Sequence, residues 1–173
     1  MTFKNAENIF ELKNAFEIIS NLDNSYPNFY DWYWNKVVPG VWSGHDEVVL
    51  AYKKDEIIGV SILKNSDEKK LRALRIKEKF QSKGFGLYLI DESLKRLNTD
   101  KPLCSVSEKM INDYSRIFIN RYQFDISHVY KGLYKKGELE YEFNGRNIEA
   151  DLKVKLLINK IIESYNIKEP KFR

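Results

Sequence analysis

The chain has 173 residues, of which 43% are apolar and 31% are charged. This length fits one domain with a modest extension and excludes two full domains, and the apolar content excludes a disordered chain. The formal net charge of +4 is too small to indicate nucleic-acid binding by itself. Residues 1–50 hold three basic and seven acidic side chains, so the positive charge lies in residues 51–173. An anionic ligand is therefore expected in the later part of the chain.

Cysteine and histidine are scarce in this chain. Cys104 has no partner for an internal disulfide, and one Cys with two His (His45 and His128) is too few for a zinc site, so we expect no metal. Residues 1–10 lack the apolar region of a signal peptide, and the longest nearly continuous apolar run, residues 57–63, is far shorter than the roughly 20 residues of a membrane span. We expect a cytoplasmic protein that does not enter the membrane.

Hydrophobic periodicity predicts an α/β fold of the α+β type, with helices packed on a mixed sheet. Residues 6–22 and 28–38 have helical spacing, and Pro39 with Gly40 is expected to end the second helix. Strands at 47–52, 57–63 and 69–76 are separated by polar turns and should form an antiparallel meander. The predicted order then continues with a helix at 86–97, a strand at 101–106, a helix at 110–122 and strands at 124–134 and 138–143.

Residues 148–165 carry a further apolar stripe at helical spacing. We therefore predict a main domain at 1–145 and a C-terminal helical extension at 146–173. Because an apolar stripe must be buried, this helix packs either on its own sheet or in a homodimer contact.

The stretch LRALRIKEKFQSKGFGLYLIDESLKRL, residues 71–97, carries the most informative pattern. A strand runs into a polar loop, and the loop runs through Gly84-Phe85-Gly86 into a helix. Helix N-termini present unpaired N–H groups and a partial positive charge, and glycine lets the backbone approach a ligand, so this pattern is typical of an anion cradle. Glycine in a simple strand-to-helix turn is the alternative interpretation. The P-loop motif and the third glycine of a dinucleotide-binding fingerprint are missing.

Two motifs resemble the GCN5-related N-acetyltransferases (GNAT), an acyl-CoA-dependent family. Gln81-Ser82-Lys83-Gly84-Phe85-Gly86 is similar to the family motif Gln/Arg-x-x-Gly-x-Gly/Ala, and it lies where that family has it, between the fourth strand and the third helix. A second family motif, Asn-x-x-Ala-x-x-Leu-Tyr-x-x-x-Gly-Phe, is matched in part by Asn112, Ser115, Phe118, Ile119, Gln123 and Phe124. The resemblance covers about four-fifths of the chain. It implies a central, mostly antiparallel sheet with helices on both faces.

The resemblance also implies acetyl-CoA as co-substrate. It places the CoA diphosphate on Gln81, Ser82, Lys83, Gly84, Phe85, Gly86 and Leu87. It places the pantetheine arm beside the backbone of Leu74, Arg75 and Ile76, and the thiol half near Asn112 and Ser115.

Proton transfer has several candidates. Glu108 or His128 would take the proton from the acceptor ammonium. Alternatively, Glu108 caps the helix that begins near Met110, and His128 is structural. Ile119 occupies the position of the family tyrosine that protonates the leaving thiolate, so Tyr114, or Tyr122 on the same helix, is the candidate acid.

The resemblance also places the acceptor near the first two helices and the turn between the sixth and seventh strands, where Tyr30, Trp34 and Tyr134 are the expected binding residues. Alternatively, the aromatic residues of the second helix form core. The implied activity is acetyl transfer to a primary amine of a small molecule, amino acid or protein. The alternatives are an acyl-CoA-binding protein without activity, and a toxin-like aminoacyl-tRNA acetyltransferase. We do not expect nucleic acid as a partner.

Overall fold

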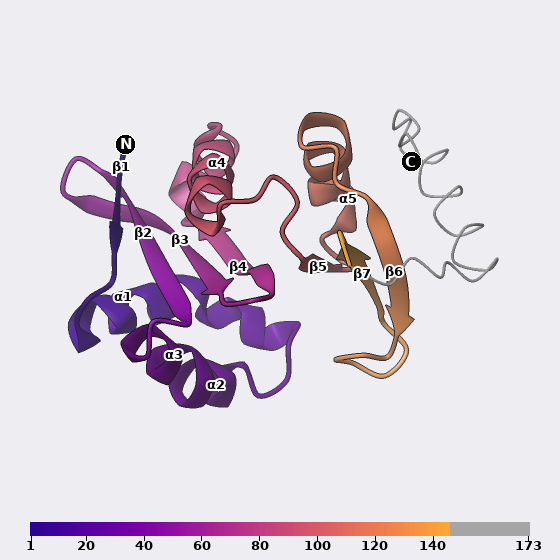
Figure 1. Cartoon of the computed structure of the whole chain (residues 1–173), viewed down its shortest axis with the longest axis horizontal. Coiled ribbons are helices and arrows are strands. Elements are labelled where there is room, and N and C mark those ends of the chain that lie inside the picture. The colour runs from indigo at the N-terminus through magenta and orange to yellow at the C-terminus, as the bar shows by residue number, and fades with distance from the viewer. Residues whose placement is uncertain (146–173) are drawn as a thin grey trace. The chain divides into compact units, whose positions relative to one another are not determined.

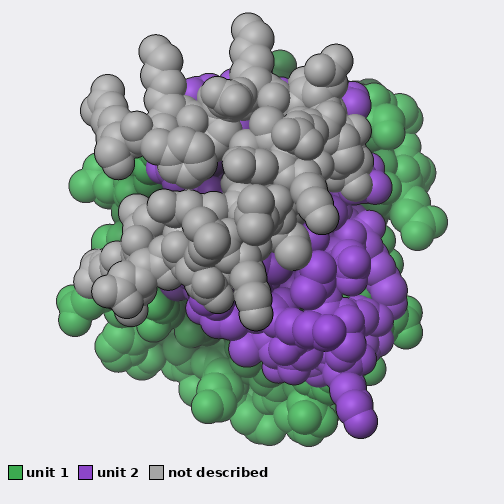
Figure 2. Space-filling view, turned by 90° about the vertical axis from the view of Figure 1, so that its right-hand side faces the viewer, with its two compact units in different colours: residues 1–102 green, residues 103–173 purple. Residues whose placement is uncertain are grey.

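The computed structural model describes residues 1–145 and divides the chain into two compact units, Met1–Pro102 and Leu103–Arg173 (Figure 2). The predicted helix at 148–165 and the extension at 146–173 lie outside the described residues. Within residues 1–145, no helix is long and apolar enough to cross a membrane. No group of three His, Cys, Asp or Glu side chains in that range is placed to hold a metal ion.

The first unit contains a four-stranded antiparallel sheet in the order β1-β2-β3-β4 (Figure 1). The strands are β1 (Thr2–Asn5), β2 (Asp46–Lys53), β3 (Glu56–Asn65) and β4 (Lys69–Ile76). The predicted meander of three strands is confirmed. Strand β1 was not predicted, because four mostly exposed residues show no periodicity of their own and form a strand only by pairing with β2.

The helices α1 (Ile9–Ile19), α2 (Phe29–Trp32) and α3 (Val38–Trp42) bury their apolar residues together with Val48, Leu50, Val60 and Ile62 of the sheet. The prediction that Pro39 and Gly40 end the second helix is wrong. A π-helical turn at Tyr33–Val37 leads directly into α3, and Pro39 stands in the first turn of that segment. Proline is tolerated there because the N–H groups of a first helical turn have no partner in their own segment.

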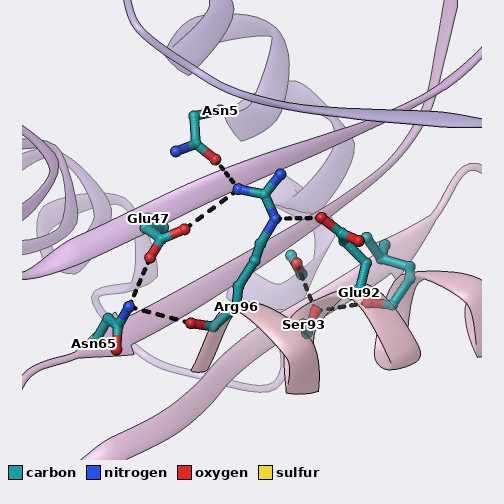
Figure 3. Close-up of polar contacts among 8 residues, drawn as sticks. Asn5, Glu47, Asn65, Glu92, Ser93 and Arg96 are labelled. Atoms are coloured by element: carbon teal, nitrogen blue, oxygen red, sulfur yellow. Dashed lines mark hydrogen bonds and ion pairs between the residues drawn. The ribbon is translucent and has the colours of Figure 1, made fainter. Parts of the chain in front are cut away.

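The helix α4 (Phe85–Leu97) packs on β3 and β4. The buried Ser93 hydroxyl donates to Leu89 O at 2.6 Å, and its oxygen lies 3.0 Å from Ser61 Oγ, the partner of a second hydrogen bond. Near the end of α4, Arg96 Nε donates to Glu92 at 2.7 Å, and its Nη1 lies 3.4 Å from Glu47 of β2 (Figure 3). This network fixes the C-terminal half of α4 on the sheet, so the position of its N-terminal end is fixed too.

Gly59 allows α4 to approach the other end of the sheet. A Cβ at Gly59 would lie 2.5 Å from Ile76 Cδ1, 2.9 Å from the carbonyl oxygen of Arg75 and 3.4 Å from Leu89 Cδ2. Only a residue without a side chain fits at this point of β3. The close contact places the start of α4 beside the end of β4.

The second unit contains β5 (Cys104–Ser107), α5 (Ile111–Ser115), a π-helical segment at Arg116–Arg121, β6 (Ile126–Lys131) and β7 (Leu139–Phe143). The three strands form an antiparallel sheet in the order β5-β7-β6. Phe118 packs against Phe124 and Phe143, with ring centroids 5.1 and 5.3 Å apart. The predicted order of elements is confirmed here, although β6 is shorter than the range 124–134.

Candidate functional site

The loop between β4 and α4 contains a tight reversal of the backbone. A 3-10 turn at Glu78–Phe80 comes first, and two main-chain hydrogen bonds of 2.8 and 3.0 Å close it. Ser82 (φ 57°) and Gly84 (φ 80°) then adopt left-handed conformations, and α4 begins at Phe85. Glycine adopts this conformation without strain, so Gly84 suits the position immediately before the helix.

Two side chains of the predicted cradle hold the loop together. Gln81 Nε2 donates to the carbonyl oxygen of Ile76 at 2.7 Å, and Lys83 Nζ donates to the carbonyl oxygen of Lys79 at 2.8 Å. A side-chain amide has two N–H groups and an ammonium has three, so both side chains keep further donors.

The main-chain amides at the start of α4 are available to a ligand. Among the described residues, the amides of residues 82–86 donate to no acceptor, whereas the amide of Leu87 donates to Gly84 O at 3.0 Å. A Cβ at Gly84 would meet nothing within 4 Å, and residues 82–84 are exposed, so this part of the loop is open. Consecutive free amides at a helix N-terminus favour an anion through hydrogen bonds and the helix dipole.

Basic side chains surround the same loop. Lys53 Nζ lies 5.2 Å from the ring centroid of Phe85 and 5.7 Å from that of Phe80. Lys79 Nζ lies 2.6 Å from the Glu56 carboxylate, and this hydrogen bond lowers the pKa of Glu56. The electrostatic environment of the loop therefore favours a negatively charged ligand.

A groove of about 760 Å³ opens beside the end of β4 in the first unit. Its lining comes from α1 and the 3-10 turn after it, the β2–β3 turn with the start of β3, and the end of β4 with the loop that follows: Asn14, Glu17, Ile18, Asn21, Asp55, Glu56, Ile57, Arg75, Ile76, Lys77, Glu78 and Lys79. Among the strands of residues 1–145, β4 is the last of its sheet, and none of them pairs with its outer edge. Arg75 and Ile76 thus line the groove at the end of β4, next to the loop with the free amides.

In the second unit, Glu108 directly follows β5 and His128 lies on β6. The Glu108 carboxylate accepts a hydrogen bond from the Leu139 amide at 3.2 Å, and the Glu108 amide donates to Leu139 O at 2.9 Å. The alternative in which Glu108 caps the following helix is wrong, because no side chain caps α5 and the carboxylate extends the pairing of β5 with β7. His128 is half-buried on β6, and its ring centroid lies 4.3 Å from that of Tyr130.

The residues of the second motif differ in exposure. Asn112 is exposed on α5, whereas Ser115 is fully buried and its hydroxyl has no hydrogen-bond partner among the described residues. Ile119 is buried in the π-helical segment, and an isoleucine side chain cannot donate a proton. Tyr114 packs on Phe118, with ring centroids 5.5 Å apart.

The aromatic residues of the first unit are divided between core and surface. Phe16 lies at the centre of a cluster with Phe29, Tyr30, Tyr33 and Trp34. Tyr33 is fully buried and its hydroxyl donates to Leu12 O at 2.7 Å, whereas Tyr30 is 59% exposed. Most of the cluster is therefore helix core, and Tyr30 is the member that a ligand can reach.

The strand β7 carries carboxylates that the sequence analysis did not assign. Glu140 is only 4% exposed, and the half-buried Glu142 accepts hydrogen bonds from Ser127 Oγ at 3.0 Å and Tyr130 Oη at 3.1 Å. Burial raises the pKa of Tyr134, as does the neighbouring Glu140 carboxylate. The alternation of Glu138, Glu140 and Glu142 with apolar residues indicated a polar face of β7, but no local signal indicated that this face is buried.

Comparison with solved structures shows extensive likeness of the backbone. A protein from Desulfovibrio desulfuricans assigned to the GNAT family of acetyltransferases superposes with a TM-score of 0.65 at 15% identity, over 82% of this chain and 96% of that one. A spermidine N-acetyltransferase SpeG chimera from Vibrio cholerae and hSSAT gives 0.62 at 14% identity, over 83% and 94%. A GNAT acetyltransferase from Elizabethkingia anophelis with acetyl-CoA bound gives 0.55 at 15% identity, over 82% and 95%. This chain has the GNAT fold.

No family model matches the chain, and no curated protein matches its sequence. The likeness is therefore one of fold, and it confirms the architecture that the two motifs implied. Within the GNAT fold of this chain, the first motif forms the β4–α4 loop and the second lies on α5 and the π-helical segment that follows.

Proposed function

We propose that this protein is an N-acetyltransferase that moves the acetyl group of acetyl-CoA to a primary amine by direct attack in a ternary complex. The observation that carries the proposal is the row of amides at residues 82–86, which donate to no acceptor within residues 1–145, next to an edge of β4 that no described strand covers. Structures of the same fold contain CoA or acetyl-CoA, among them an aminoglycoside 6'-N-acetyltransferase and the protein from Elizabethkingia anophelis. Fold and local chemistry thus support the same class of ligand.

The residues of the β4–α4 loop suit the CoA diphosphate. The free amides and the N-terminus of α4 would hold its oxygens, with Lys83 adding a positive charge. Gly84 and Gly86 have no Cβ, so the diphosphate can approach the backbone closely. The edge of β4 at Leu74, Arg75 and Ile76 would bind the amide groups of the pantetheine arm, as an added strand does.

Acetyl-CoA supplies an acetyl group activated as a thioester, together with a thiolate that can leave. The protein must remove one proton from the acceptor ammonium, so that the neutral nitrogen can attack the thioester. The new C–N bond then forms and the C–S bond breaks. The nitrogen loses its second proton, which the protein must also accept. Glu108 and His128 are the candidates for proton removal. Glu108 is held against the Leu139 amide, which fixes the position of its carboxylate. Tyr114 is the candidate that returns a proton to the departing sulfur.

A second candidate function is acyl-CoA binding without transfer. Ile119 favours it, because a buried isoleucine stands where the family tyrosine donates a proton. A thiol has a pKa near 8.5 and can leave as thiolate, and acid catalysis is typically worth about 10² to 10⁴-fold, so transfer does not require that tyrosine.

Two measurements on the full chain test both candidates. Acetyl-CoA at about 100 times its Kd should stabilise the fold by about 2.7 kcal/mol, seen as a raised Tm. Release of free CoA thiol on adding primary amines supports transfer, whereas a Tm shift without CoA release favours the binding protein. Absence of any Tm shift with acetyl-CoA would contradict both.

A further inference from the structure

Strand β4 contains a β-bulge at Arg72. Leu71 pairs with Leu63 of β3 and Ala73 pairs with Ile62, so the register gives Arg72 no partner in β3. A bulge adds one residue to a strand, bends the strand and changes the direction of the groups next to it. The conformation at Arg72 therefore sets the direction in which the rest of β4 runs towards the β4–α4 loop.

The Arg72 guanidinium is held by residues of other elements of the first unit. Its Nη1 donates to Asp46 Oδ2, at the start of β2, at 2.9 Å, and its Cζ lies 6.0 Å from the ring centroid of Trp32 on α2. A cation at this distance from an indole ring is attracted by the π electrons. A Cβ at Gly40 of α3 would overlap the Asp46 carboxylate, so glycine lets α3 lie this close. We call Asp46, Arg72, Trp32 and Gly40 the Arg72 cluster.

The Arg72 cluster contributes more to position than to stability. Asp46 is buried, and its Oδ1 makes no hydrogen bond within residues 1–145. Removing two charges from water is costly, and the attraction within a buried ion pair often does no more than offset that cost. The pair does fix geometry, because the carboxylate of β2 reaches past β3 and holds the one residue of β4 that the sheet register leaves unpaired.

The end of β4 beyond the bulge carries the outer edge that the proposed function assigns to the pantetheine arm. The Lys77 amide donates to Ile58 O of β3 at 2.8 Å. Backbone groups alternate in direction along an antiparallel strand, so those of Leu74 and Ile76 face away from β3. Pantetheine has two amide groups between its diphosphate and its sulfur. An arm that pairs with Ile76 and then Leu74 therefore brings the thioester to the bulge.

We propose that Asp46 is a positioning residue, which holds Arg72 in the bulge and thereby fixes the backbone of β4 against which the acetyl thioester lies. The carbonyl oxygen of the thioester gains negative charge as the amine nitrogen adds, and backbone groups already aimed at it lower the barrier. A misplacement of about 1 Å can cost about 10²-fold in rate. This inference rests on the proposed acetyltransferase function.

Binding of the CoA diphosphate should not depend on the Arg72 cluster. The amides of residues 82–86 lie in the loop after β4, and the hydrogen bonds from Gln81 to Ile76 O and from Lys83 to Lys79 O hold that loop. These contacts involve neither Asp46 nor Arg72. Loss of the cluster should therefore slow the chemical step and leave acetyl-CoA affinity nearly unchanged.

The test measures affinity and turnover separately in Asp46→Asn and Arg72→Lys. Asparagine keeps the shape of the carboxylate without its charge, and lysine keeps the charge of Arg72 without its planar fork of donors. Titration calorimetry gives the Kd for acetyl-CoA. Turnover is the release of free CoA thiol at saturating acetyl-CoA with hydroxylamine, after subtraction of the reaction without protein. Hydroxylamine is a small amine that is largely uncharged at neutral pH, so it attacks without prior loss of a proton and forms acetohydroxamate.

We expect turnover to fall at least tenfold in both variants, with the Kd for acetyl-CoA within about threefold of the wild-type value. Tyr33→Phe is the matched control, because it removes a buried hydrogen bond from the same unit, the one to Leu12 O. It should lower the Tm and keep turnover. A residue that serves the fold alone would not separate turnover from affinity in this way.

The outcomes separate this inference from the proposed function. If acetyl-CoA does not bind to the wild type, both fail. If Asp46→Asn and Arg72→Lys turn over like the wild type, the inference is overturned and the acetyltransferase function stands. A loss of affinity as large as the loss of turnover overturns it too, as does an equal loss of turnover in Tyr33→Phe.

Two further results also decide the matter. A wild-type protein that binds acetyl-CoA and does not accelerate the hydroxylamine reaction would show that no thioester is oriented for attack, which overturns the inference. If Asp46→Asn does not fold, Arg72→Lys provides the decision. Failure of both variants to fold would show that the ion pair serves the fold, and the inference would again be overturned.

Discussion

The side-chain amide of Gln81 donates a hydrogen bond of 2.7 Å to the main-chain carbonyl of Ile76, the last residue of β4. This contact ties the middle of the loop to the strand that precedes it. It therefore sets where the free amides of residues 82–86 lie with respect to the edge of β4. A ligand that uses both features needs them in one fixed arrangement.

We predict that Gln81→Ala weakens acetyl-CoA binding about tenfold, equivalent to about 1.4 kcal/mol. The variant loop must be ordered when the ligand binds, which costs conformational entropy. Isothermal titration calorimetry measures the effect, and Lys95→Ala, at an exposed position of α4, is the control. Equal affinities of Gln81→Ala and wild type would show that the bond to Ile76 does not prepare the site.

The substitution Gly86→Ala should weaken ligand binding without destabilising the fold. An alanine Cβ there would come no closer than 3.9 Å to Ile76 Cγ1, so Gly86→Ala fits the fold. We expect unfolding free energy in urea to stay equal or to rise by about 0.5–1 kcal/mol, because alanine favours helix. The same methyl group stands among the free amides, so acetyl-CoA affinity should fall at least tenfold. Unchanged affinity would contradict the placement of the diphosphate.

Gly59→Ala should have the opposite effect on stability. The added Cβ would lie 2.9 Å from the Arg75 carbonyl oxygen, a main-chain atom that cannot move alone. We predict a loss of about 1–3 kcal/mol in urea unfolding, as for other overpacked interiors. Gly86→Ala is the matched control. A Gly59→Ala protein as stable as wild type would mean that α4 does not approach the sheet as closely as described.

Substitutions at Tyr33 and Tyr30 test which rings of the aromatic cluster are buried in the core and which are exposed. Tyr33→Phe removes the buried hydrogen bond to Leu12 O and should cost about 1–2 kcal/mol of unfolding free energy. Tyr30→Ala, at an exposed ring, should change stability by about 0.5 kcal/mol or less. If Tyr30 contacts the acceptor, this variant raises KM for the amine and leaves acetyl-CoA affinity unchanged. A large stability loss in Tyr30→Ala would place this ring in the core.

Local sequence patterns were sufficient to predict most helices and strands and the position of the β4–α4 loop. The strand predicted at 69–76 has those bounds, because strongly periodic apolar residues end at a clear polar turn. The motif with Gly84 and Gly86 predicted a backbone that a ligand can approach closely; at Gly84, immediately before α4, a Cβ would meet nothing within 4 Å. These features depend on neighbouring residues in the chain, which a sequence displays directly.

Features that depend on distant residues were missed. Strand β1 forms by pairing with β2, and helical structure continues past Pro39, which stands in the first turn of α3 after a π-helical turn. The burial of Glu140 also has no local signal, since alternation along β7 indicates which residues share a face and not what covers it. Sequence reasoning therefore predicted the loop before α4 and overlooked the buried carboxylate of Glu140 on β7.

A last prediction concerns Asp46, which is 5% exposed and pairs with Arg72 at 2.9 Å. Burial raises the pKa of Asp46 above its ordinary value of 3.8, although Arg72, Lys64 and His45 lower it. The folded chain therefore keeps the Asp46 carboxyl protonated up to a higher pH than the unfolded chain does. The resulting contribution to stability is present below the ordinary pKa and is lost as the pH rises through the raised pKa.

Asp46→Asn cannot bind this proton. As the pH falls from about 7 to about 4, the unfolding free energy of the wild type should therefore gain on that of Asp46→Asn. Urea unfolding at several pH values measures this difference, and the exposed Asp100→Asn is the control. Parallel pH profiles of wild type and Asp46→Asn would show that Arg72 offsets the burial of the carboxylate, because the pKa of Asp46 would then be the same in the folded and unfolded chains.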